Sequence, residues 1–328
     1  MAELQLVTGA AGFLGQALVK RLTAAGLPVR CLVRPGADAS RLELPGVEIF
    51  RGDLLEPAVG EAALSGAARV WHLAALVRPT GLLVRRRALL ARFKAVNEDL
   101  PARLAAAAAR AGVKRFIHFS SIAALGPGEN LRDDAPPAPL TWYGKSKLAG
   151  ERLFKAEAAR AGLDHLVLRP CMVYGPGAKA WEPLFDAAAR NKVLVPGDAA
   201  NIFSICYVEN FLDGALLAAG KAPSGAALNV SEGSLSMRDL LLTLAAALGR
   251  RPRLVSLPVP ALRAVSAVLD AALGLAGLYL PGVMGADPAR FKEACSSWSH
   301  SCEGLRALGW KPAVSTLDGL AASLGEKL

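Results

Sequence analysis

The stretch LQLVTGAAGFLGQ, residues 4–16, decides the fold of this chain. Its apolar opening predicts a buried strand, and residues 13–22 carry the 3.6-residue periodicity of a helix. Gly9, Gly12 and Gly15 separate the two at G-x-x-G-x-x-G spacing. A glycine turn between a strand and a helix lets backbone N–H groups and the positive end of the helix dipole approach a pyrophosphate. We therefore expect a dinucleotide to bind here, which an ordinary strand-to-helix turn would not do.

Length and composition indicate a large globular protein. The chain has 328 residues, of which 53% are hydrophobic, and this excludes a disordered protein. Five cysteines without a C-x-x-C pair argue against a disulfide framework or a metal site, and they suit a reducing cytoplasm. The N-terminus shows no basic segment with a cleavage site, so we expect no signal peptide. The net charge of +10 comes from scattered arginines with few interleaved aromatic residues, so we expect no nucleic-acid partner.

Predicted strands and helices alternate along the first half of the chain. Apolar segments predict strands at residues 29–33, 47–50, 69–73 and 113–119, and an alanine-rich segment predicts a helix at residues 96–111. The alternation predicts an α/β fold of the Rossmann type, with a doubly wound parallel sheet that binds its ligand at the carboxyl ends of the strands. We assign residues 1–170 to the dinucleotide-binding domain and residues 171–328 to a smaller, mostly helical substrate lobe, parts of which return to the first domain.

The end of the second predicted strand bears on the choice of cofactor. Folds that bind NAD usually place an acidic residue about 20 residues beyond the glycines, where it accepts a hydrogen bond from the ribose 2′-hydroxyl. Arg34 stands there instead, and the first acidic residue downstream is Asp38. A guanidinium binds a 2′-phosphate, which favours NADP(H) over NAD(H), unless Arg34 is an ordinary solvated loop charge. Asp53, just beyond the third strand, is placed to accept a hydrogen bond from the adenine amino group.

Two other segments have more than one interpretation. A basic cluster favours a solvated helix face over a site for an acidic substrate tail or a membrane surface; its members are Arg78, Arg85, Arg86, Arg87, Arg92 and Lys94. Residues 254–284 carry an apolar helix face, but their uncharged run is too short to span a membrane. This segment is either the apolar wall of the substrate lobe, which could also make peripheral contact with a membrane, or an ordinary core helix.

The reactive groups are expected where a helical pattern begins at Tyr143. Tyr143 and Lys147 are four residues apart and therefore lie on one face of this helix. A phenol with a pKa of about 10 is a poor acid–base catalyst at neutral pH, but a nearby ammonium and the charge of an oxidised nicotinamide favour its phenolate form. Ser121, at the end of another predicted strand, is placed to hydrogen-bond the reacting oxygen. Together with the glycine turn, these residues indicate proton transfer next to a dinucleotide.

Six motifs give the chain a wider resemblance. TGAAGFLG, GDL, HLAA, FSS, YGKSK and LRPCMVYGPG occur in the order and approximate spacing of the extended short-chain dehydrogenase/reductase family, part of the NAD-dependent epimerase/dehydratase superfamily. The resemblance covers essentially the whole chain, including LGWKP near the C-terminus. It implies that Tyr143 is the acid/base, that Lys147 tunes it and holds the nicotinamide ribose, and that Ser121 donates to the substrate oxygen. Asn97 matches a residue of cofactor placement and proton relay, although VNEDL replaces the family's N-V-x-G-T run.

The motifs and the resemblance together imply a set of cofactor-binding residues around the carboxyl ends of the strands. They are Thr8, Gly9, Gly12, Phe13, Leu14, Gly15, Arg34, Asp53, Leu54, Leu73, Ala74, Ala75, Ser120, Tyr143, Lys147, Pro170 and Val173. Residues 170–173 match the segment whose backbone meets the nicotinamide carboxamide. Family members often dimerise through a helix bundle, so a homodimer is also considered.

Two branches of the family fit poorly. Dehydratases carry an Asp-Glu pair directly after the active serine or threonine, whereas Ile122 follows Ser121 here. Nucleotide-sugar epimerases usually place an arginine shortly before a Y-V-x-D segment, and residues 201–206 are apolar where that cation should stand. The chain looks more like the 3β-hydroxysteroid dehydrogenase and dihydroflavonol-reductase branches.

The sequence therefore predicts an NADP(H)-dependent oxidoreductase that interconverts a secondary alcohol and a ketone. The expected substrate is a bulky apolar small molecule, either a sterol-like 3β-hydroxy/3-keto compound or a long acyl β-keto compound. The alternatives are a nucleotide-sugar epimerase that retains NAD and a non-catalytic protein that senses NADP; the intact Tyr143 and Lys147 argue against the second. We expect a cytoplasmic protein and leave membrane association through residues 254–284 open.

Overall fold

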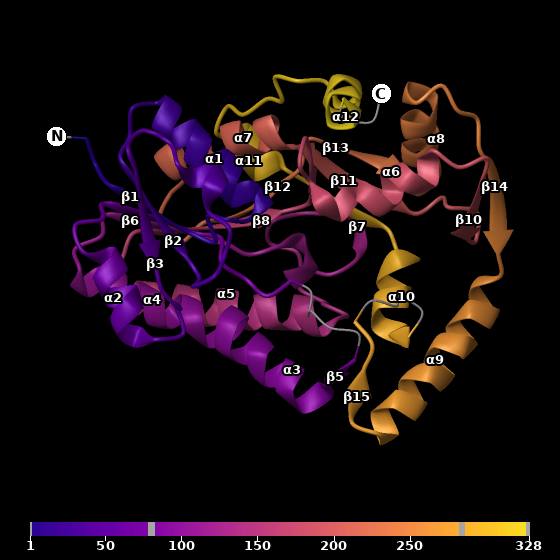
Figure 1. The fold of residues 1–328 in the computed structure, drawn as a ribbon, viewed down its shortest axis with the longest axis horizontal. Coiled ribbons are helices and arrows are strands. Elements are labelled where there is room, and N and C mark those ends of the chain that lie inside the picture. The colour runs from indigo at the N-terminus through magenta and orange to yellow at the C-terminus, as the bar shows by residue number, and fades with distance from the viewer. Residues whose placement is uncertain (1, 78–82, 282–285, 326–328) are drawn as a thin grey trace.

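A seven-stranded parallel sheet forms the centre of the molecule (Figure 1). The computed structural model describes residues 2–77, 83–281 and 286–325. In spatial order the strands are β12 (Ala227–Val230), β8 (His165–Pro170), β6 (Arg115–Phe119), β4 (Arg69–His72), β1 (Gln5–Thr8), β2 (Val29–Val33) and β3 (Val47–Arg51), and all neighbours are parallel. The order of the strands reverses between β1 and β4, as in a doubly wound sheet. The predicted fold class is confirmed.

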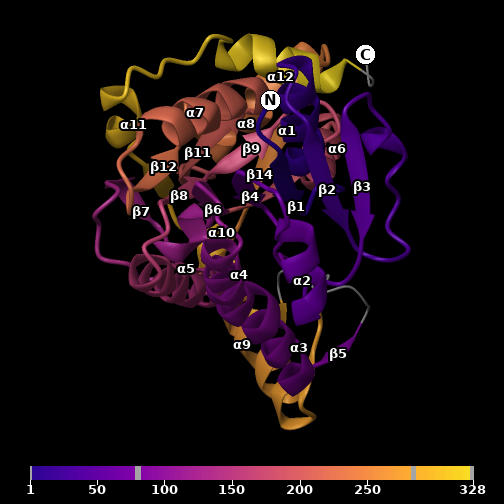
Figure 2. The same cartoon turned by 90° about the vertical axis from the view of Figure 1, so that its left-hand side faces the viewer.

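Alternating apolar side chains bury both faces of this sheet. Leu6 of β1 packs with α2 (Pro57–Leu64), α4 (Leu100–Arg110) and α5 (Trp142–Arg160), whereas its neighbour Val7 packs with α1 (Phe13–Ala24) and α7 (Val208–Lys221). Val70 and Trp71 of β4 divide between the two cores in the same way. Figure 2 shows the helices on either side of the strands. Burial on both faces explains why the strands read as nearly continuous apolar runs in the sequence.

The rest of the chain combines helices with short sheets. Strand β11 (Ile202–Tyr207) pairs with β9 (Met172–Tyr174), β13 (Gly233–Ser236) and β16 (Trp298–His300), and β16 also pairs with β7 (Gly128–Leu131). Two further pairs join β10 (Lys192–Pro196) to β14 (Arg253–Leu257) and β5 (Val84–Arg85) to β15 (Leu278–Tyr279). The helices are α6 (Glu182–Ala188), α8 (Met237–Ala247), α9 (Val259–Leu275), α10 (Pro288–Ala294), α11 (Glu303–Ala307) and α12 (Thr316–Leu324). Because β12 lies in the main sheet, a late segment does return to it, while the division at residue 170 stays a prediction.

The helix predicted at residues 96–111 is interrupted in the structure. Helix α3 (Arg86–Phe93) continues into a π-helical turn, Lys94–Asp99, and only then does α4 begin. Buried Asn97 lies in this turn, and its side chain bonds to backbone groups outside the helix. Such turns are a local irregularity that helical periodicity alone does not reveal.

Residues 254–284 form strand β14, helix α9 and strand β15, and residues 282–284 of this segment lie outside the described part. Ser266 is the one buried residue of α9, so the interpretation of this segment as an ordinary core helix is wrong. In the described ranges, no helix combines the length and hydrophobicity that crossing a membrane requires. Arg78 of the basic cluster also lies outside the described residues.

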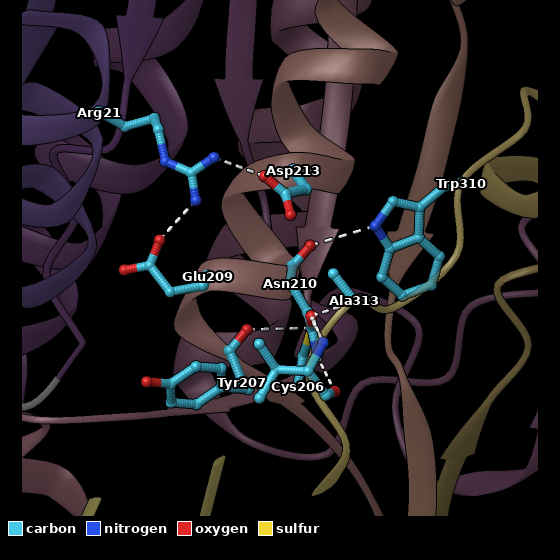
Figure 3. A network of polar contacts seen from close by, with 9 residues as sticks. Arg21, Cys206, Tyr207, Glu209, Asn210, Asp213, Trp310 and Ala313 are labelled. Atoms are coloured by element: carbon cyan, nitrogen blue, oxygen red, sulfur yellow. Dashed lines mark hydrogen bonds and ion pairs between the residues drawn. The ribbon is translucent and has the colours of Figure 1, made fainter. Parts of the chain in front are cut away.

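A buried polar network ties the C-terminal segment to α7 (Figure 3). The side chain of Asn210 on α7 donates to Glu232 and to a backbone carbonyl, and it accepts hydrogen bonds from the N–H groups of residues 313–314. The Trp310 indole donates to the carbonyl of Asn210 at 3.1 Å. Arg21 of α1 forms ion pairs with two carboxylates of α7. The LGWKP segment and α1, the helix that follows the glycine turn, thus both contact α7.

Candidate active site

The glycine turn lies at the carboxyl edge of the main sheet. Gly9 has a φ of +70°, and a Cβ atom there would stand 2.7 Å from the backbone nitrogen of Ala74. A Cβ atom on Gly15 would stand 2.3 Å from the carbonyl oxygen of Gly9. Leu73, Ala74 and Ala75, which follow β4, thus run directly alongside the turn. Only glycine fits these two positions, and the resulting bare backbone has the form that a pyrophosphate needs.

The start of α1 leaves polar groups available to an anion. Phe13 and Leu14 begin the helix, Gly12 is its N-cap, and none of the described side chains caps it. The first turn also carries no acidic residue. An uncapped helix N-terminus of this kind attracts phosphate. Thr8 is buried at the end of β1 and accepts a hydrogen bond from the N–H of Ala74 at 3.3 Å, which fixes the neighbouring strand end.

Two guanidinium groups belong to the strand ends where the adenosine ribose is expected. Arg34 follows β2 directly and is exposed. The carboxylate of Asp38 accepts a backbone N–H two residues further on, at 2.9 Å. Arg51, the last residue of β3, pairs in register with Val33, and its guanidinium donates to the carbonyl of Ala37 at 3.1 Å. Arg51 could not be predicted from the sequence, because a single cation at a strand end gives no signal until the pairing of β2 with β3 is known.

Asp53 and Leu54 follow β3. Asp53 accepts the N–H of Leu55 through Oδ1 at 2.9 Å, and none of the described residues hydrogen-bonds its second oxygen. Leu54 is buried in the core below α2 and α4, and its carbonyl accepts a hydrogen bond from Arg103 at 2.7 Å. The second carboxylate oxygen of Asp53 is therefore available to accept a hydrogen bond from a ligand, whereas the side chain of Leu54 packs in the core.

The start of α5 brings Tyr143 and Ser121 together. Thr141 caps the helix by accepting the N–H of Gly144 at 3.2 Å. A Cβ atom on Gly144 would stand 2.4 Å from the carbonyl oxygen of Ala123, so this glycine lets the segment after β6 lie against the helix. Within that segment, the Ser121 hydroxyl accepts the N–H of Ala123 at 3.1 Å and also hydrogen-bonds with Tyr143. The two hydroxyl groups predicted to meet at the reacting oxygen are thus neighbours.

Lys147 is buried one turn further along α5. Its Nζ donates to the carbonyl oxygen of Phe119 at 2.7 Å. Burial lowers the pKa of Lys147 to about 8, while the Glu151 carboxylate acts in the opposite direction. The stacked rings of His72 and His118, 5.4 Å apart, are also buried. Burial and the charge of Lys147 lower the pKa of His72 to about 3 and that of His118 well below its ordinary value, so both are neutral packing groups at neutral pH.

The pKa of Tyr143 differs from the expected direction. Burial raises it above the usual phenol value, the hydrogen bond with Ser121 lowers it, and the nearby Glu293 carboxylate raises it. The charge of Lys147 is not among these causes, although we expected it to favour the phenolate. The physical reason is that the ammonium of Lys147 is directed at the carbonyl of Phe119, while loss of hydration opposes any charge on the phenol.

Asn97 connects the π-helical turn to α5. Its Oδ1 accepts the N–H of Leu76 at 2.8 Å, and its Nδ2 donates to the Leu76 carbonyl and to the Ser146 hydroxyl at 2.9 and 3.0 Å. A Cβ atom on Gly150 would stand 1.8 Å from the Asn97 carbonyl oxygen, so α5 approaches this turn very closely. The side chain next in sequence to Ser146 is Lys147. Asn97 therefore positions this part of α5, and its role in a proton relay stays a prediction.

The ends of β6 and β8 complete the predicted cofactor set. Ser120 Oγ is buried, and no partner for it exists among the described residues. Buried hydroxyl groups are nearly always hydrogen-bonded, so a ligand polar atom would complete this one. Pro170 ends β8, and the carbonyl of Val173 in β9 accepts the Trp181 indole at 3.0 Å. The glycine cradle, the uncapped helix and the orphaned Ser120 fit a dinucleotide along this edge.

A pocket of about 180 Å³ lies beside Tyr143. Its apolar and aromatic lining residues are Val77, Phe93, Trp142, Tyr143 and Tyr279. Its other lining residues are polar or charged: Thr141, Asp287, Arg290 and Glu293. Glu293 accepts the Thr141 hydroxyl at 2.8 Å, and Asp287 accepts the Tyr279 hydroxyl at 2.8 Å. The residues of this pocket wall that come from β15 and α10 could not be predicted from the sequence. The Asp-Pro pair at 287–288 signals a helix start, but nothing local indicates that α10 covers Tyr143.

Comparison with known proteins now bears on this geometry. A family model described as "NAD dependent epimerase/dehydratase family" matches residues 5–231. The chain belongs to the NAD dependent epimerase/dehydratase family. The resemblance predicted from the motifs is confirmed, and the chain is an NAD(P)-dependent enzyme of the dehydrogenases and reductases that act on CH–OH groups.

Two relatives and one solved structure show the range within the family. The chain is 31% identical to a ceramide reductase of Caulobacter vibrioides, over 93% of this chain and 95% of the relative. It is 32% identical to a 3 beta-hydroxysteroid dehydrogenase/Delta 5-->4-isomerase of Mycobacterium tuberculosis, over 68% of this chain and 62% of the relative. The structure of MoeE5 in complex with UDP-glucuronic acid and NAD superposes with a TM-score of 0.75 at 26% identity and covers 99% of both chains.

Proposed function

We propose that this chain is an NADP(H)-dependent oxidoreductase that interconverts a secondary alcohol and a ketone on a bulky, largely apolar small molecule. The observation that carries the proposal is that Tyr143, which hydrogen-bonds with Ser121, lines a pocket together with Phe93, Trp142 and Tyr279. A phenol that lines an aromatic pocket and has a hydroxyl neighbour suits the reduction of a carbonyl on an apolar skeleton.

Ser121, Tyr143, Lys147 and Asn97 each have a separate role in the proposed reaction. Bound next to the pocket, the nicotinamide supplies or accepts the hydride. Ser121 holds the substrate oxygen by a hydrogen bond, and Tyr143 gives that oxygen a proton during reduction or takes it during oxidation. Lys147, fixed by the Phe119 carbonyl, holds the nicotinamide ribose next to the tyrosine. Asn97 keeps the turn of α5 that carries Lys147 in place.

Two observations, the names of the relatives and the apolar residues of β11, support an apolar substrate. The named relatives act on a ceramide and on a 3β-hydroxysteroid, and both are bulky apolar compounds. Residues 202–206 belong to β11, where Phe203 is buried against Ile122 and Trp298. This apolar strand stands where nucleotide-sugar epimerases usually place the arginine that clamps the substrate's diphosphate. The substrate class we propose is a sterol-like 3-keto compound or a long acyl β-keto compound.

The preference for NADP(H) over NAD(H) is part of the same proposal. It is supported by Arg34 and Arg51 at adjacent strand ends and by the engagement of Asp38 in its own turn. Titration of intrinsic fluorescence with NADPH and NADH tests it. The Arg34→Asp variant should reverse the preference, because a carboxylate repels the 2′-phosphate and accepts the 2′-hydroxyl. Tighter binding of NADH by the unaltered protein would contradict the proposal.

A panel of substrates tests the reaction itself. NADPH consumption would be followed with a 3-ketosteroid, a long-chain β-keto amide and a small ketone such as acetone. We expect turnover of one of the two bulky ketones and a much higher KM for the small one, because the apolar walls bind the larger skeleton. Activity confined to a nucleotide sugar, with NAD retained through purification, would establish the epimerase alternative instead.

The proposal also includes a cytoplasmic location and a homodimer. We place the protein in the cytoplasm, where its five cysteines, free thiols in the structure, would stay reduced. A homodimer is supported by the exposed Leu90 of α3 and Leu153 of α5, which lie on neighbouring helices.

A further inference from the structure

Helix α9 turns its apolar side away from the protein. Val265, Val268 and Leu275 are 57%, 70% and 93% exposed, and the helical period places them on one face with Ala261 and Ala272. In a helix that packs on a protein core, the apolar face points inward and the polar face points to the solvent. Large exposed apolar surfaces in a folded protein mark an interaction site.

Ser266 and Asp270 of α9 lie on its inner side, whereas Arg263 is exposed. Ser266 is the buried residue of the helix, and Asp270 forms an ion pair with Arg86 of α3. The Arg86 guanidinium also donates to the carbonyl groups of Asp270 and Leu278, each at 2.8 Å. Asp270, the one carboxylate of α9, is thereby paired, and the other charged residue of the helix, exposed Arg263, is a cation that does not oppose an anionic surface. The helix is held in an orientation that exposes its apolar side.

Basic residues flank this apolar face. Arg85 on β5 and Arg87 on α3 are exposed, and neither has an ion-pair partner in the part of the chain that the structure describes. Leu83, 49% exposed, precedes them. Because β5 pairs with β15, which follows α9, these side chains belong to the same end of the molecule (Figures 1 and 2). An apolar face beside unpaired arginines is complementary to an anionic lipid surface.

We infer that this end of the molecule, formed by α9, β5, β15 and the start of α3, docks on an anionic phospholipid surface. The outward side of α9 lies among the acyl chains near the headgroups, and Arg85 and Arg87 contact lipid phosphates. Docking of this kind is peripheral, because α9 lies along the surface and does not cross it.

The docking end is continuous with the pocket beside Tyr143. Tyr279 belongs to β15 and lines the pocket, and it packs with Phe93 and Leu89 of α3. An apolar substrate dissolved in the lipid would therefore meet the pocket wall directly beyond the docking surface. This route depends on the proposed function, whereas the docking itself does not.

Vesicle co-sedimentation of the full chain tests the inference. We expect the protein to sediment with vesicles of phosphatidylcholine and phosphatidylglycerol, and less with phosphatidylcholine alone. The Val268→Glu/Leu275→Glu variant should lose about tenfold or more in affinity, since two apolar contacts are replaced by repelled charges. Replacing Arg85 and Arg87 by alanine should weaken binding roughly 25-fold at low salt, about fivefold for each cation, and the effect should shrink as salt rises.

A matched variant separates docking from general surface effects. Leu194→Glu/Leu317→Glu introduces the same charge at residues 59% and 67% exposed on β10 and α12, and it should bind vesicles like the unaltered protein. Three outcomes would overturn the inference: no sedimentation with anionic vesicles, an equal loss in both double-glutamate variants, or a lipid-free dimer that only Val268→Glu/Leu275→Glu converts to a monomer. The last would show that a second copy of the chain covers α9. Ketone reduction without vesicles, measured in parallel, reports on the proposed function separately.

Discussion

Tyr143 has two neighbours that act on its proton in opposite directions. The hydrogen bond with Ser121 lowers the pKa of the phenol, while the Glu293 carboxylate and burial raise it. Burial also raises the pKa of Glu293 itself, and its Oε1 is held by Thr141. At the scale of single residues, the pKa of Tyr143 therefore depends on residues from distant segments, and only Ser121 was visible in the sequence.

Replacing Glu293 by glutamine should lower the pKa of Tyr143. The substitution keeps an acceptor for Thr141 but removes the negative charge that disfavours a phenolate. For alcohol oxidation, which needs the phenolate, the rising limb of the pH–rate profile should move to lower pH. The measurement is kcat against pH for Glu293→Gln and for Glu129→Gln, an exposed control on β7. A shift of the limb to higher pH, or the same shift in both variants, would show that Glu293 does not act on the phenol.

Helix α5 carries most of the candidate site, and its position depends on small residues. Gly144 allows the segment after β6 to touch the helix, and Gly150 allows the same for the π-helical turn. Below them, the buried ion pair between Glu151 and Arg169 joins α5 to β8. The sequence predicted α5, the place of Tyr143 and Lys147 on it, and the parallel strands, because periodicity and turn glycines are local signals. It could not predict that α10 faces Tyr143 or that α9 is exposed, because both depend on how distant segments pack.

The Gly144→Ala variant tests the contact between α5 and the serine segment. An added methyl group would meet the Ala123 carbonyl oxygen at 2.4 Å and force the segment away from the helix. A displacement of about 1 Å between Ser121 and Tyr143 should lower kcat by about a hundredfold. Gly220→Ala on α7, where nothing lies within 4 Å, is the matched control. NADPH binding, followed by fluorescence, should persist in both variants, and an unchanged kcat in Gly144→Ala would refute the proposed positioning.

The whole molecule depends on a few buried polar residues that join its distant parts. Asn210 links α7 to Glu232 and to residues 313–314 through four side-chain hydrogen bonds. Figure 3 shows Asn210 beside Trp310 and Ala313 of the C-terminal segment. From the sequence, the LGWKP segment is known only as part of the resemblance to the family, and no physical role for it can be predicted. The structure supplies one, since the Trp310 indole bonds to the Asn210 backbone.

Asn210→Ala should destabilise the fold by about 3 kcal/mol, because several buried partners lose their hydrogen bonds at once. Denaturant unfolding measures this loss directly. The control is Asn191→Ala, an exposed residue for which we expect little change. A loss below that of the control would mean that the C-terminal segment is held by other contacts.

The most direct measurement for the proposed reaction is the turnover of a bulky ketone by Tyr143→Phe, with NADPH binding measured on the same sample. The variant removes one oxygen and leaves the aromatic wall of the pocket in place. We predict that kcat falls by about 10²–10⁴-fold while the affinity for NADPH is unchanged, the loss expected for a general acid. A variant that retains full turnover would contradict the account, because the proton would then come from elsewhere.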